Sequence, residues 1–435
     1  MALFGQSHKN IWLILYFDKN NLKKIILFKK NYVNLRSYFL FKILKYYMID
    51  FKNTQIAFES KSNADLRRAK ILFSCMQRGW LVKTGKFLAE FASAIHFPIA
   101  WALKPTIYRQ FVGGENLKEC VPVAEKLTKS GIYSIFDNSV EGGGTEEAIK
   151  TNFDEAIRSI VFTKEQKNVA YAVFKPTALA PADLLEKASS GEKLTEEEQT
   201  IYQKFQIRFE QLCQKAFEMD IRILVDAESY CYQNEIDKLT EDMMRKFNKT
   251  RAIVFTTLQM YRHDRMKYLE FLYDDAVKND YIVGMKFVRG AYMEKERARA
   301  KKLGYLDPIC PNKAATDENY DNGLRFTVEH IDRFEVFNGT HNEKSNLLLT
   351  ELLEKHNIKP NDSRIFFSQL YGMSDNLSYN LAKAGYNVAK YVPYAPVRDV
   401  LPYLIRRAEE NTSIAGQTSR EMELINTEVK RRKAQ

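Results

Sequence analysis

Two adjacent arginines lie near the C-terminus, in the stretch LPYLIRRAEEN at residues 401–411. On a helix, Arg406 and Arg407 would diverge by about 100°, and Glu410 follows within one turn. A solvated helix face with weak ion pairs explains this pattern. The alternative is an anion site, because two guanidinium groups can hold one carboxylate or phosphate and fix its orientation.

Other polar residues recur at the ends of segments that we predict to be strands. Each segment is short and rich in β-branched and aromatic residues, and a charged helical stretch follows it. The polar side chains at the C-terminal ends are Asp137, Lys175, Asp226, Glu228, Gln259, Lys286, Arg289, His341, Asn342, Gln369 and Tyr394. Any one of them has an ordinary explanation as a cap or a loop residue. Their recurrence at the same end of every strand predicts a site.

The types of these residues indicate the chemistry of that site. Its lysines and arginines make it cationic, so it should attract an anion, with Glu410 partly neutralising the charge. Gln259, Thr340 and Asn342 supply the donors and acceptors that a flat heterocycle needs along its edge. His341 has no ligand-spaced His, Cys or carboxylate partner, so we expect hydrogen bonding from it and no metal.

Eight predicted strands must position these side chains. They are 131–138, 170–176, 221–228, 251–259, 282–290, 333–342, 364–370 and 387–394. Their apolar character and the helical segments between them indicate an α/β fold with parallel pairing. Eight such units over about 265 residues are typical of a (β/α)8 TIM-like barrel, in which the strand ends meet at one mouth. A doubly wound sheet competes, but the first unit lacks the GxGxxG turn.

Further helices are predicted outside the eight units. Residues 62–110 carry apolar side chains at three-to-four spacing, and residues 182–219 have the composition of an inserted, charged helical hairpin. We divide the chain into a basic leader at 1–47, an N-terminal helical region at 48–125 and the barrel at 126–435.

The composition of the chain limits the classes of protein that it can belong to. With 435 residues, 45% of them hydrophobic, the chain can bury a large core. Its five cysteines are scattered without CxxC spacing, which favours neither a disulfide framework nor a zinc site. Residues 1–47 hold nine Lys or Arg against one Asp, so they carry +8 of the net +11 and leave +3 for the rest. The nearly balanced remainder gives no sign of nucleic-acid binding.

The leader is built mainly from Asn, Lys, Ile, Leu, Phe and Tyr, which have AT-rich codons. We expect it to be non-native or disordered, with the natural start at Met48. An organelle-targeting peptide is the rival interpretation, although the segment has one arginine and few serines. Lysines interrupt each apolar run, so it does not have the pattern of a transmembrane span.

Five motifs together resemble those of proline dehydrogenase, a family of FAD-dependent barrel enzymes. They are VDAES at 225–229, MKFVRGAYMEKER at 285–297, NGTHN at 338–342, FSQLYGMSD at 367–375 and YAPVRDVLPYLIRRAEEN at 394–411. The resemblance runs in order from about residue 50 to the C-terminus and is closer to the monofunctional, eukaryotic-type branch. It implies oxidation of L-proline to 1-pyrroline-5-carboxylate by hydride transfer to FAD N5, the first step of proline catabolism.

The resemblance also implies roles for individual residues. Those at the substrate would be Lys175, Asp226, Tyr292, Tyr394, Arg406 and Arg407. Those at FAD would be Gln259, Lys286, Val288, Gly290, Thr316, Thr340, His341, Asn342 and Glu410. The two arginines would pair with the proline carboxylate, and Tyr394 would pack against the proline ring. Many bacterial members have arginine where this chain has Lys286, which offers a point charge in place of a fork.

Partners and location follow from the same resemblance. We expect L-proline as substrate, a membrane quinone as electron acceptor, possible peripheral membrane association and no nucleic-acid partner. The protein would then be cytoplasmic or peripheral at the inner face of a respiratory membrane, and mitochondrial if eukaryotic. Two alternatives stay open: an aldolase-like barrel that uses Lys175 as a Schiff base, and a membrane-surface or nucleic-acid protein that acts through its leader.

Overall fold

The computed structural model describes residues 3–7, 11–17, 23–29 and 49–435, without 96, 141–143 and 414–416. The chain divides into two units, residues 1–50 and 51–435. In the first unit, β1 (Leu3–Ser7), β2 (Ile11–Phe17) and β3 (Lys23–Lys29) pair as an antiparallel sheet. Residues 30–48 lie outside the described residues, and both hypotheses about the leader stay predictions.

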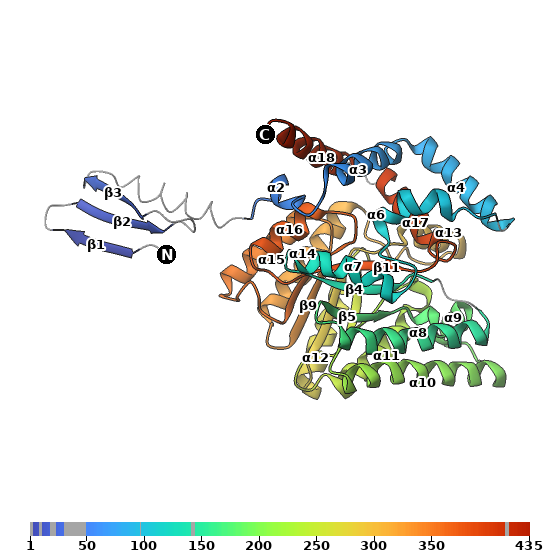
Figure 1. Cartoon of the computed structure of the whole chain (residues 1–435). Coiled ribbons are helices and arrows are strands. Elements are labelled where there is room, and N and C mark those ends of the chain that lie inside the picture. The colour runs from blue at the N-terminus through green and yellow to red at the C-terminus, as the bar shows by residue number, and fades with distance from the viewer. Residues whose placement is uncertain are drawn as a thin grey trace. The chain divides into compact units, whose positions relative to one another are not determined.

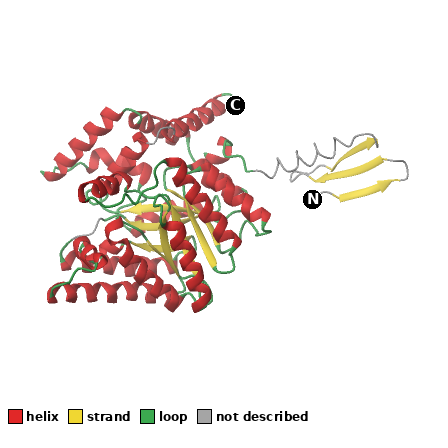
Figure 2. Cartoon of the chain, turned by 180° about the vertical axis from the view of Figure 1, so that it is seen from behind, coloured by secondary structure: helices red, strands yellow, loops and turns green. Residues whose placement is uncertain are grey.

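Eight parallel strands in the second unit close into a barrel, which confirms the predicted TIM-like fold. They are β4 (Ile132–Asn138), β5 (Val169–Phe174), β6 (Arg222–Val225), β7 (Val254–Gln259), β8 (Val283–Val288), β9 (Phe334–Gly339), β10 (Ile365–Leu370) and β11 (Val388–Tyr394). Each pairs with its neighbour in sequence, and β11 pairs with β4 to close the ring. Figure 1 labels β4, β5, β9 and β11 of the barrel, and Figure 2 shows the strands enclosed by helices.

Helices follow the strands and cover the outside of the barrel. They are α8 (Glu146–Glu165), α11 (Tyr230–Phe247), α12 (Arg265–Asn279), α13 (Met293–Leu303), α14 (Lys313–Glu329), α15 (Glu343–Lys355), α16 (Asp375–Lys383) and α17 (Leu401–Ser413). Between β5 and β6, α9 (Ala182–Ser190) and α10 (Glu196–Glu218) form the predicted helical hairpin. Phe209 of α10 packs edge-on against Phe174, with ring centroids 5.1 Å apart, so the hairpin is anchored to the barrel wall.

Alternation along the strands fixes which side chains enter the barrel. The interior core includes Tyr171, whose ring meets those of Phe255, Phe337 and Phe366 edge-on at 5.1–5.4 Å. Side chains on a strand repeat every two residues. For each of β4, β5, β6 and β7, a polar residue lies two or four positions after an interior core residue. These polar residues are Asp137, Lys175, Asp226 and Gln259. These polar side chains therefore project toward the barrel axis at its C-terminal mouth.

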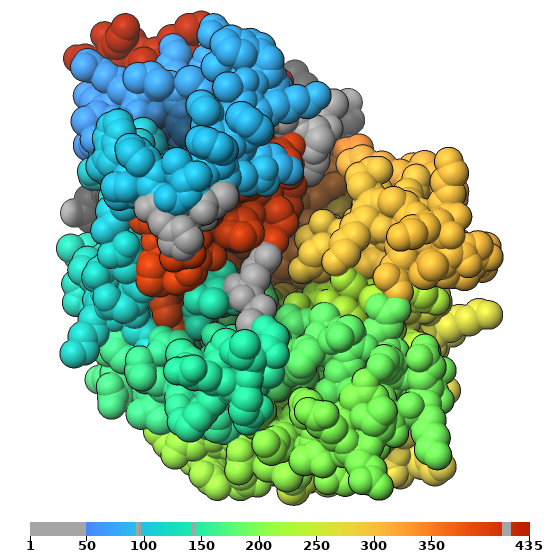
Figure 3. Space-filling view, turned by 90° about the vertical axis from the view of Figure 1, so that its right-hand side faces the viewer, coloured from blue at the N-terminus to red at the C-terminus, as the bar shows by residue number. Residues whose placement is uncertain are grey.

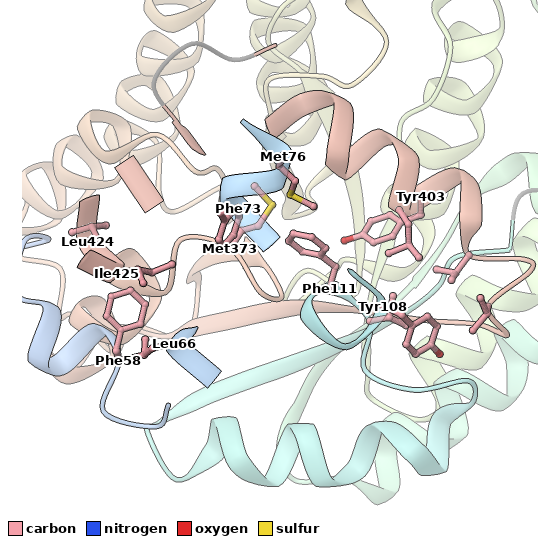
Figure 4. Close-up of a cluster of buried hydrophobic side chains, with 14 of the residues drawn as sticks. Phe58, Leu66, Phe73, Met76, Tyr108, Phe111, Met373, Tyr403, Leu424 and Ile425 are labelled. Atoms are coloured by element: carbon pink, nitrogen blue, oxygen red, sulfur yellow. The ribbon is translucent and has the colours of Figure 1, made fainter. Parts of the chain in front are cut away.

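Helices from the two ends of the second unit pack together beside this mouth. The N-terminal helices are α2 (Thr54–Ala57), α3 (Asn63–Met76), α4 (Gly79–Ala94), α5 (Ala100–Leu103), η1 (Lys104–Tyr108), α6 (Arg109–Phe111) and α7 (Leu117–Thr128), and α18 (Gln417–Lys433) ends the chain. Phe73, Phe111, Tyr403 and Leu424 belong to one buried apolar cluster (Figure 4). The cluster joins the N-terminal helices to α17 and so fixes the helix that carries the arginine pair.

Candidate active site

Asp226 is the centre of a buried charge network at the barrel mouth. Its Oδ1 accepts hydrogen bonds from Lys286 Nζ at 2.5 Å and from the Tyr391 hydroxyl at 3.0 Å. Lys286 Nζ also donates to the Tyr391 oxygen at 3.0 Å and lies 4.6 Å from the centre of that ring. Burial, with Asp226 nearby, raises the pKa of Tyr391 well above 10, so its hydroxyl keeps its proton.

A second ion pair lies on the neighbouring strands. Lys175 Nζ donates to Asp137 Oδ1 at 2.6 Å. Burial alone would lower the pKa of Lys175, but the carboxylates of Asp137, Asp226 and Glu228 raise it above 10.5. Lys175 therefore stays an ammonium at neutral pH. An amine that acts as a Schiff-base nucleophile needs a lowered pKa, so this environment argues against the aldolase-like alternative.

Gln259 reaches the same mouth from β7 and is almost completely buried. Its Nε2 donates to the Glu228 carbonyl at 2.8 Å, and its Oε1 has no hydrogen-bond partner among the described residues. Glu228 in turn accepts from the Thr177 backbone N–H at 2.9 Å and its hydroxyl at 2.6 Å. A buried acceptor without a partner is costly, so Gln259 presents an oxygen suited to an N–H group of a bound molecule.

Polar groups after β8 and β9 form a second cluster at the mouth. Arg289 donates to the Thr340 hydroxyl at 2.7 Å and to Asp317 at 2.8 Å. The Asn342 backbone N–H also donates to the Thr340 hydroxyl, and Asn342 caps α15 by accepting from Ser345 N at 3.1 Å. These contacts hold the two loops together and orient the neutral donors and acceptors predicted from the sequence.

His341 is neutral in this environment. Its Nδ1 lies 2.9 Å from the Ser374 hydroxyl. Burial, together with the positive charges of Lys390, Arg407 and Arg289, lowers the pKa of His341 from 6.5 to about 3. The ring therefore takes part in hydrogen bonding, as expected from the sequence.

The remaining predicted site residues, which are three cofactor residues and the substrate residue Tyr292, lie at the end of β8 or after it. Val288 ends this strand, and Gly290 adopts a φ of 124°. A Cβ at Gly290 would lie 2.5–2.6 Å from atoms of the Tyr261 ring, so this close approach requires glycine. Tyr292 is the N-cap residue of α13, and Thr316 is buried in the first turn of α14.

The arginine pair lies on α17, which passes beside the mouth. Arg407 is 8% exposed; it donates to Glu410 Oε1 at 2.6 Å, and its guanidinium carbon lies 5.2 Å from the centre of the Tyr403 ring. Arg406 is half-buried. Figure 3 shows the start of this helix, in red-orange, between the blue N-terminal helices and the green barrel segments. A buried guanidinium held in this way is oriented before any ligand binds.

Electrostatic proximity places α17 relative to the strand ends. The charge of Arg407 acts on His341, which follows β9, and the charge of Asp137, at the end of β4, acts on Tyr403. The helix therefore lies close enough to the ends of β9 and β4 for these charges to act. These two strands flank β10 and β11 in the barrel. The structure thus places Arg407 and Tyr403 of this helix near strand-end residues, which the solvated-face interpretation does not require.

Tyr394 is a correction to the expectations. It is three residues after Tyr391 on β11, an odd number, so the two side chains leave opposite faces of the strand. Its hydroxyl donates to Glu155 Oε1 of α8, on the outside of the barrel, at 2.8 Å. Gln369 likewise faces away from the axis and accepts from the Ser378 hydroxyl at 2.7 Å.

The sequence-based assignment of roles missed Tyr391 and Tyr403. It also missed that Asp137 is the ion-pair partner of Lys175. Counting by two from Ala389, an interior residue, would have selected Tyr391 over Tyr394. No local signal marks Tyr403, because its position beside Arg407 depends on how α17 packs.

The residues present fit a flavin. Gln259 offers an acceptor without a partner among the described residues, and Thr340, Asn342 and Lys286 offer further polar contacts. A flat heterocycle with N–H and carbonyl groups on its edge matches this set. These donors and acceptors belong to this chain, and the binding of FAD stays a prediction.

The fold and the mouth define the class of protein as a barrel enzyme. A crystal structure of proline utilization A from Bdellovibrio bacteriovorus, inactivated by N-propargylglycine, superposes with a TM-score of 0.69 at 20% sequence identity, over 88% of this chain and 42% of that one. Such an identity shows a shared fold.

Sequence comparison identifies the family. The family model described as proline dehydrogenase matches residues 120–420. The carbapenem antibiotics biosynthesis protein CarD of Pectobacterium carotovorum is 32% identical over 322 residues, which are 74% of this chain and 83% of that protein. Human proline dehydrogenase 1, mitochondrial, is 41% identical over 243 residues, 55% of this chain and only 40% of the human protein. The chain belongs to the proline dehydrogenase family.

Proposed function

We propose that this protein oxidises L-proline to 1-pyrroline-5-carboxylate with FAD as the hydride acceptor. The observation that carries the proposal is the position of Arg407, buried and oriented by Glu410, beside a mouth that contains two lysine–carboxylate pairs. Membership of the proline dehydrogenase family supports the same reaction.

The substrate's carboxylate is the group that the arginine pair would bind. Proline is small, so fixing its carboxylate with two guanidinium groups restricts the orientation of the whole ring, and positioning of this kind can lower a barrier by about 7–11 kcal/mol. The reacting amine must be neutral to release hydride from the adjacent carbon. The ammonium group of Lys175 and the ion-paired Lys286 disfavour a further positive charge nearby and so favour the neutral amine.

The cofactor residues would hold FAD along the other side of the mouth. Gln259, Lys286, Val288, Gly290, Thr316, Thr340, His341, Asn342 and Glu410 are the residues that we assign to it. FAD, when bound, supplies the two-electron chemistry that amino-acid side chains lack. Because Lys286 is hydrogen-bonded to Asp226 and Tyr391, its charge is fixed in position without any contribution from a ligand.

We further propose a membrane quinone as electron acceptor and peripheral association with the membrane that contains it. The name of the human relative places that protein in mitochondria, and a respiratory membrane would supply the acceptor here as well. Among the described residues, no helix combines the length and the hydropathy that crossing a membrane requires.

The flavin spectrum of the purified full-length protein tests the reaction. We expect a yellow protein whose flavin absorption bleaches on anaerobic addition of L-proline and recovers with a soluble quinone analogue. D-proline, which has the same charges but the opposite configuration, is the matched control and should bleach it far more slowly. A colourless protein that borohydride traps with a carbonyl substrate would instead support the Schiff-base alternative.

A further inference from the structure

One face of α4 exposes large apolar side chains to solvent. Trp80, Phe87, Leu88 and Phe91 of α4, and Ile95 directly after its end, are each between 56% and 66% exposed. Successive residues of a helix are rotated by about 100°, so positions 80, 87, 91 and 95 form one stripe, with 88 at its edge. The rings of Phe87 and Phe91 stack along it, 6.4 Å apart. We call these five residues the α4 apolar face.

This face continues beyond the end of α4. Phe97 and Trp101 follow in the next turns of chain and are 54% and 74% exposed. Contiguous exposed apolar residues are uncommon on a soluble monomer and mark an interaction surface. Figure 1 shows α4 on the outer edge of its unit.

The opposite side of α4 is already occupied by α17. The two helices pack together, and Lys86 Nζ forms an ion pair with Glu409 Oε1 at 2.8 Å. Lys86 is about 140° around the helix from Phe91. The α4 apolar face therefore points away from the protein's own core, and α4 separates it from the helix that carries Arg406 and Arg407.

Basic residues accompany the apolar ones. The stretch 78–104 contains Arg78, Lys83, Lys86 and Lys104 against Glu90, but Lys86 pairs with Glu409 and Lys104 with Glu115. Arg78 and Lys83 against Glu90 therefore leave a net charge of +1 for this surface. Arg78 and Lys83 are exposed. Trp and Phe on one side with Lys or Arg along the edge are typical of helices that lie in the interface of an anionic bilayer. A second copy of this chain would bring the same positive charges together and fits less well.

We propose that the α4 apolar face docks the protein on an anionic lipid bilayer. Docking would place α17 about one helix diameter, ~10 Å, from the lipid surface. One consequence rests on the proposed function. If that function holds, the flavin site opens beside the lipid bilayer, in which an apolar quinone is dissolved. The docking itself does not depend on the reaction.

Vesicle co-sedimentation of the full-length holoprotein tests the surface. Vesicles of phosphatidylcholine with phosphatidylglycerol are compared with vesicles of phosphatidylcholine alone. We expect the parent to bind the anionic vesicles, and Phe87→Ser with Phe91→Ser to lower the partition coefficient at least about tenfold. Lys83→Glu should weaken binding to the anionic vesicles. The matched control changes two exposed apolar residues of α10, Ile207→Ser with Phe217→Ser, and should bind as the parent does.

Tryptophan fluorescence gives a second measurement. The chain has three tryptophans, of which Trp80 and Trp101 lie on this surface and Trp12 lies in the leader. In a Trp12→Phe background, anionic vesicles should shift the emission to the blue. An unshifted spectrum would overturn the proposal, as would undiminished sedimentation of the Phe87/Phe91 variant, because the basic leader would then account for binding. A dimer that this variant dissociates would show a second copy as the occupant and would also overturn it.

Activity with a soluble acceptor separates this proposal from the proposed function. The Phe87/Phe91 variant should oxidise proline with the soluble acceptor as the parent does and lose activity only with a quinone embedded in vesicles. If the Phe87/Phe91 variant loses vesicle binding and neither the parent nor the variant oxidises proline, the docking surface is supported and the proposed reaction is contradicted.

Discussion

Tyr391 and Tyr394, three residues apart on β11, face opposite sides of the barrel wall. The hydroxyl of Tyr391 donates to Asp226 Oδ1 at 3.0 Å inside the mouth, and that of Tyr394 donates to Glu155 Oε1 at 2.8 Å on the outside. The same chemical change at the two positions should therefore have different consequences.

Replacing each tyrosine by phenylalanine tests this difference. Tyr394→Phe should leave kcat/KM for L-proline unchanged and lower the free energy of unfolding by about 0.5–1.5 kcal/mol, the value of one hydrogen bond. Tyr391→Phe should lower kcat/KM by about tenfold, because Asp226 loses a donor and the mouth loses a hydroxyl. Steady-state kinetics and chemical denaturation measure both. Reduced kcat/KM in Tyr394→Phe with full activity in Tyr391→Phe would reverse the assignment.

The arginine pair should determine substrate affinity. Arg406→Met and Arg407→Met should each raise KM for L-proline about ten- to hundredfold while flavin content stays unchanged, because a charge-assisted hydrogen bond is worth about 1.5–3 kcal/mol. Arg398→Met, a change of the same type at an exposed arginine in the turn before α17, is the control. Normal proline kinetics in both variants would restore the solvated-face interpretation.

Lys286 should be required for the integrity of the mouth. Its side chain is 8% exposed and that of Asp226 is 16% exposed, so Lys286→Met leaves a largely buried carboxylate without its cation. We expect a loss of about 3–5 kcal/mol of stability and less bound flavin per protein. Lys286→Arg keeps the charge and should retain most of both. Equal flavin content and equal stability in Lys286→Met and the parent would exclude this role.

Glu421 should make stability depend on pH. It is buried on α18 and accepts from Ser374 N at 2.7 Å. Burial, and less so the charge of Asp375, raises its pKa from 4.5 to about 7. The unfolded chain ionises more readily, so this group's contribution is fully present below pH 4.5 and is lost as the pH rises to about 7.

Glu421→Gln removes that titration while it keeps an acceptor for Ser374. Relative to the variant, the parent should lose up to about 3 kcal/mol of unfolding free energy between acidic and neutral pH. Denaturation midpoints at several pH values from 4.5 to 7.5 measure this difference. His341 has a lowered pKa, so its contribution to stability is lost in acid. It is present in both proteins, and its contribution to the unfolding free energy cancels in the comparison. Parallel pH profiles would contradict the prediction.

The sequence by itself determined the elements of the barrel and the polar residues at the ends of its strands. Its eight strands were predicted within a few residues, because buried parallel strands have a local signature of short β-branched and aromatic runs. Lys175, Asp226, Gln259 and Lys286 were predicted correctly at the mouth, since the ends of parallel strands must converge once the barrel closes.

Only the tertiary structure decided which face each residue uses. The side chains of Tyr391 and Tyr394 differ in direction because strand alternation has a phase, and pairing with β4 and β10 sets that phase. Tyr403 reaches the site through the packing of α17 against α3 and α4, which are more than 300 residues away in sequence. The apolar residues of α4 have the spacing of a core-facing helix. Their exposure follows from the position of α17, which occupies the other side of α4, and a local pattern does not contain that information.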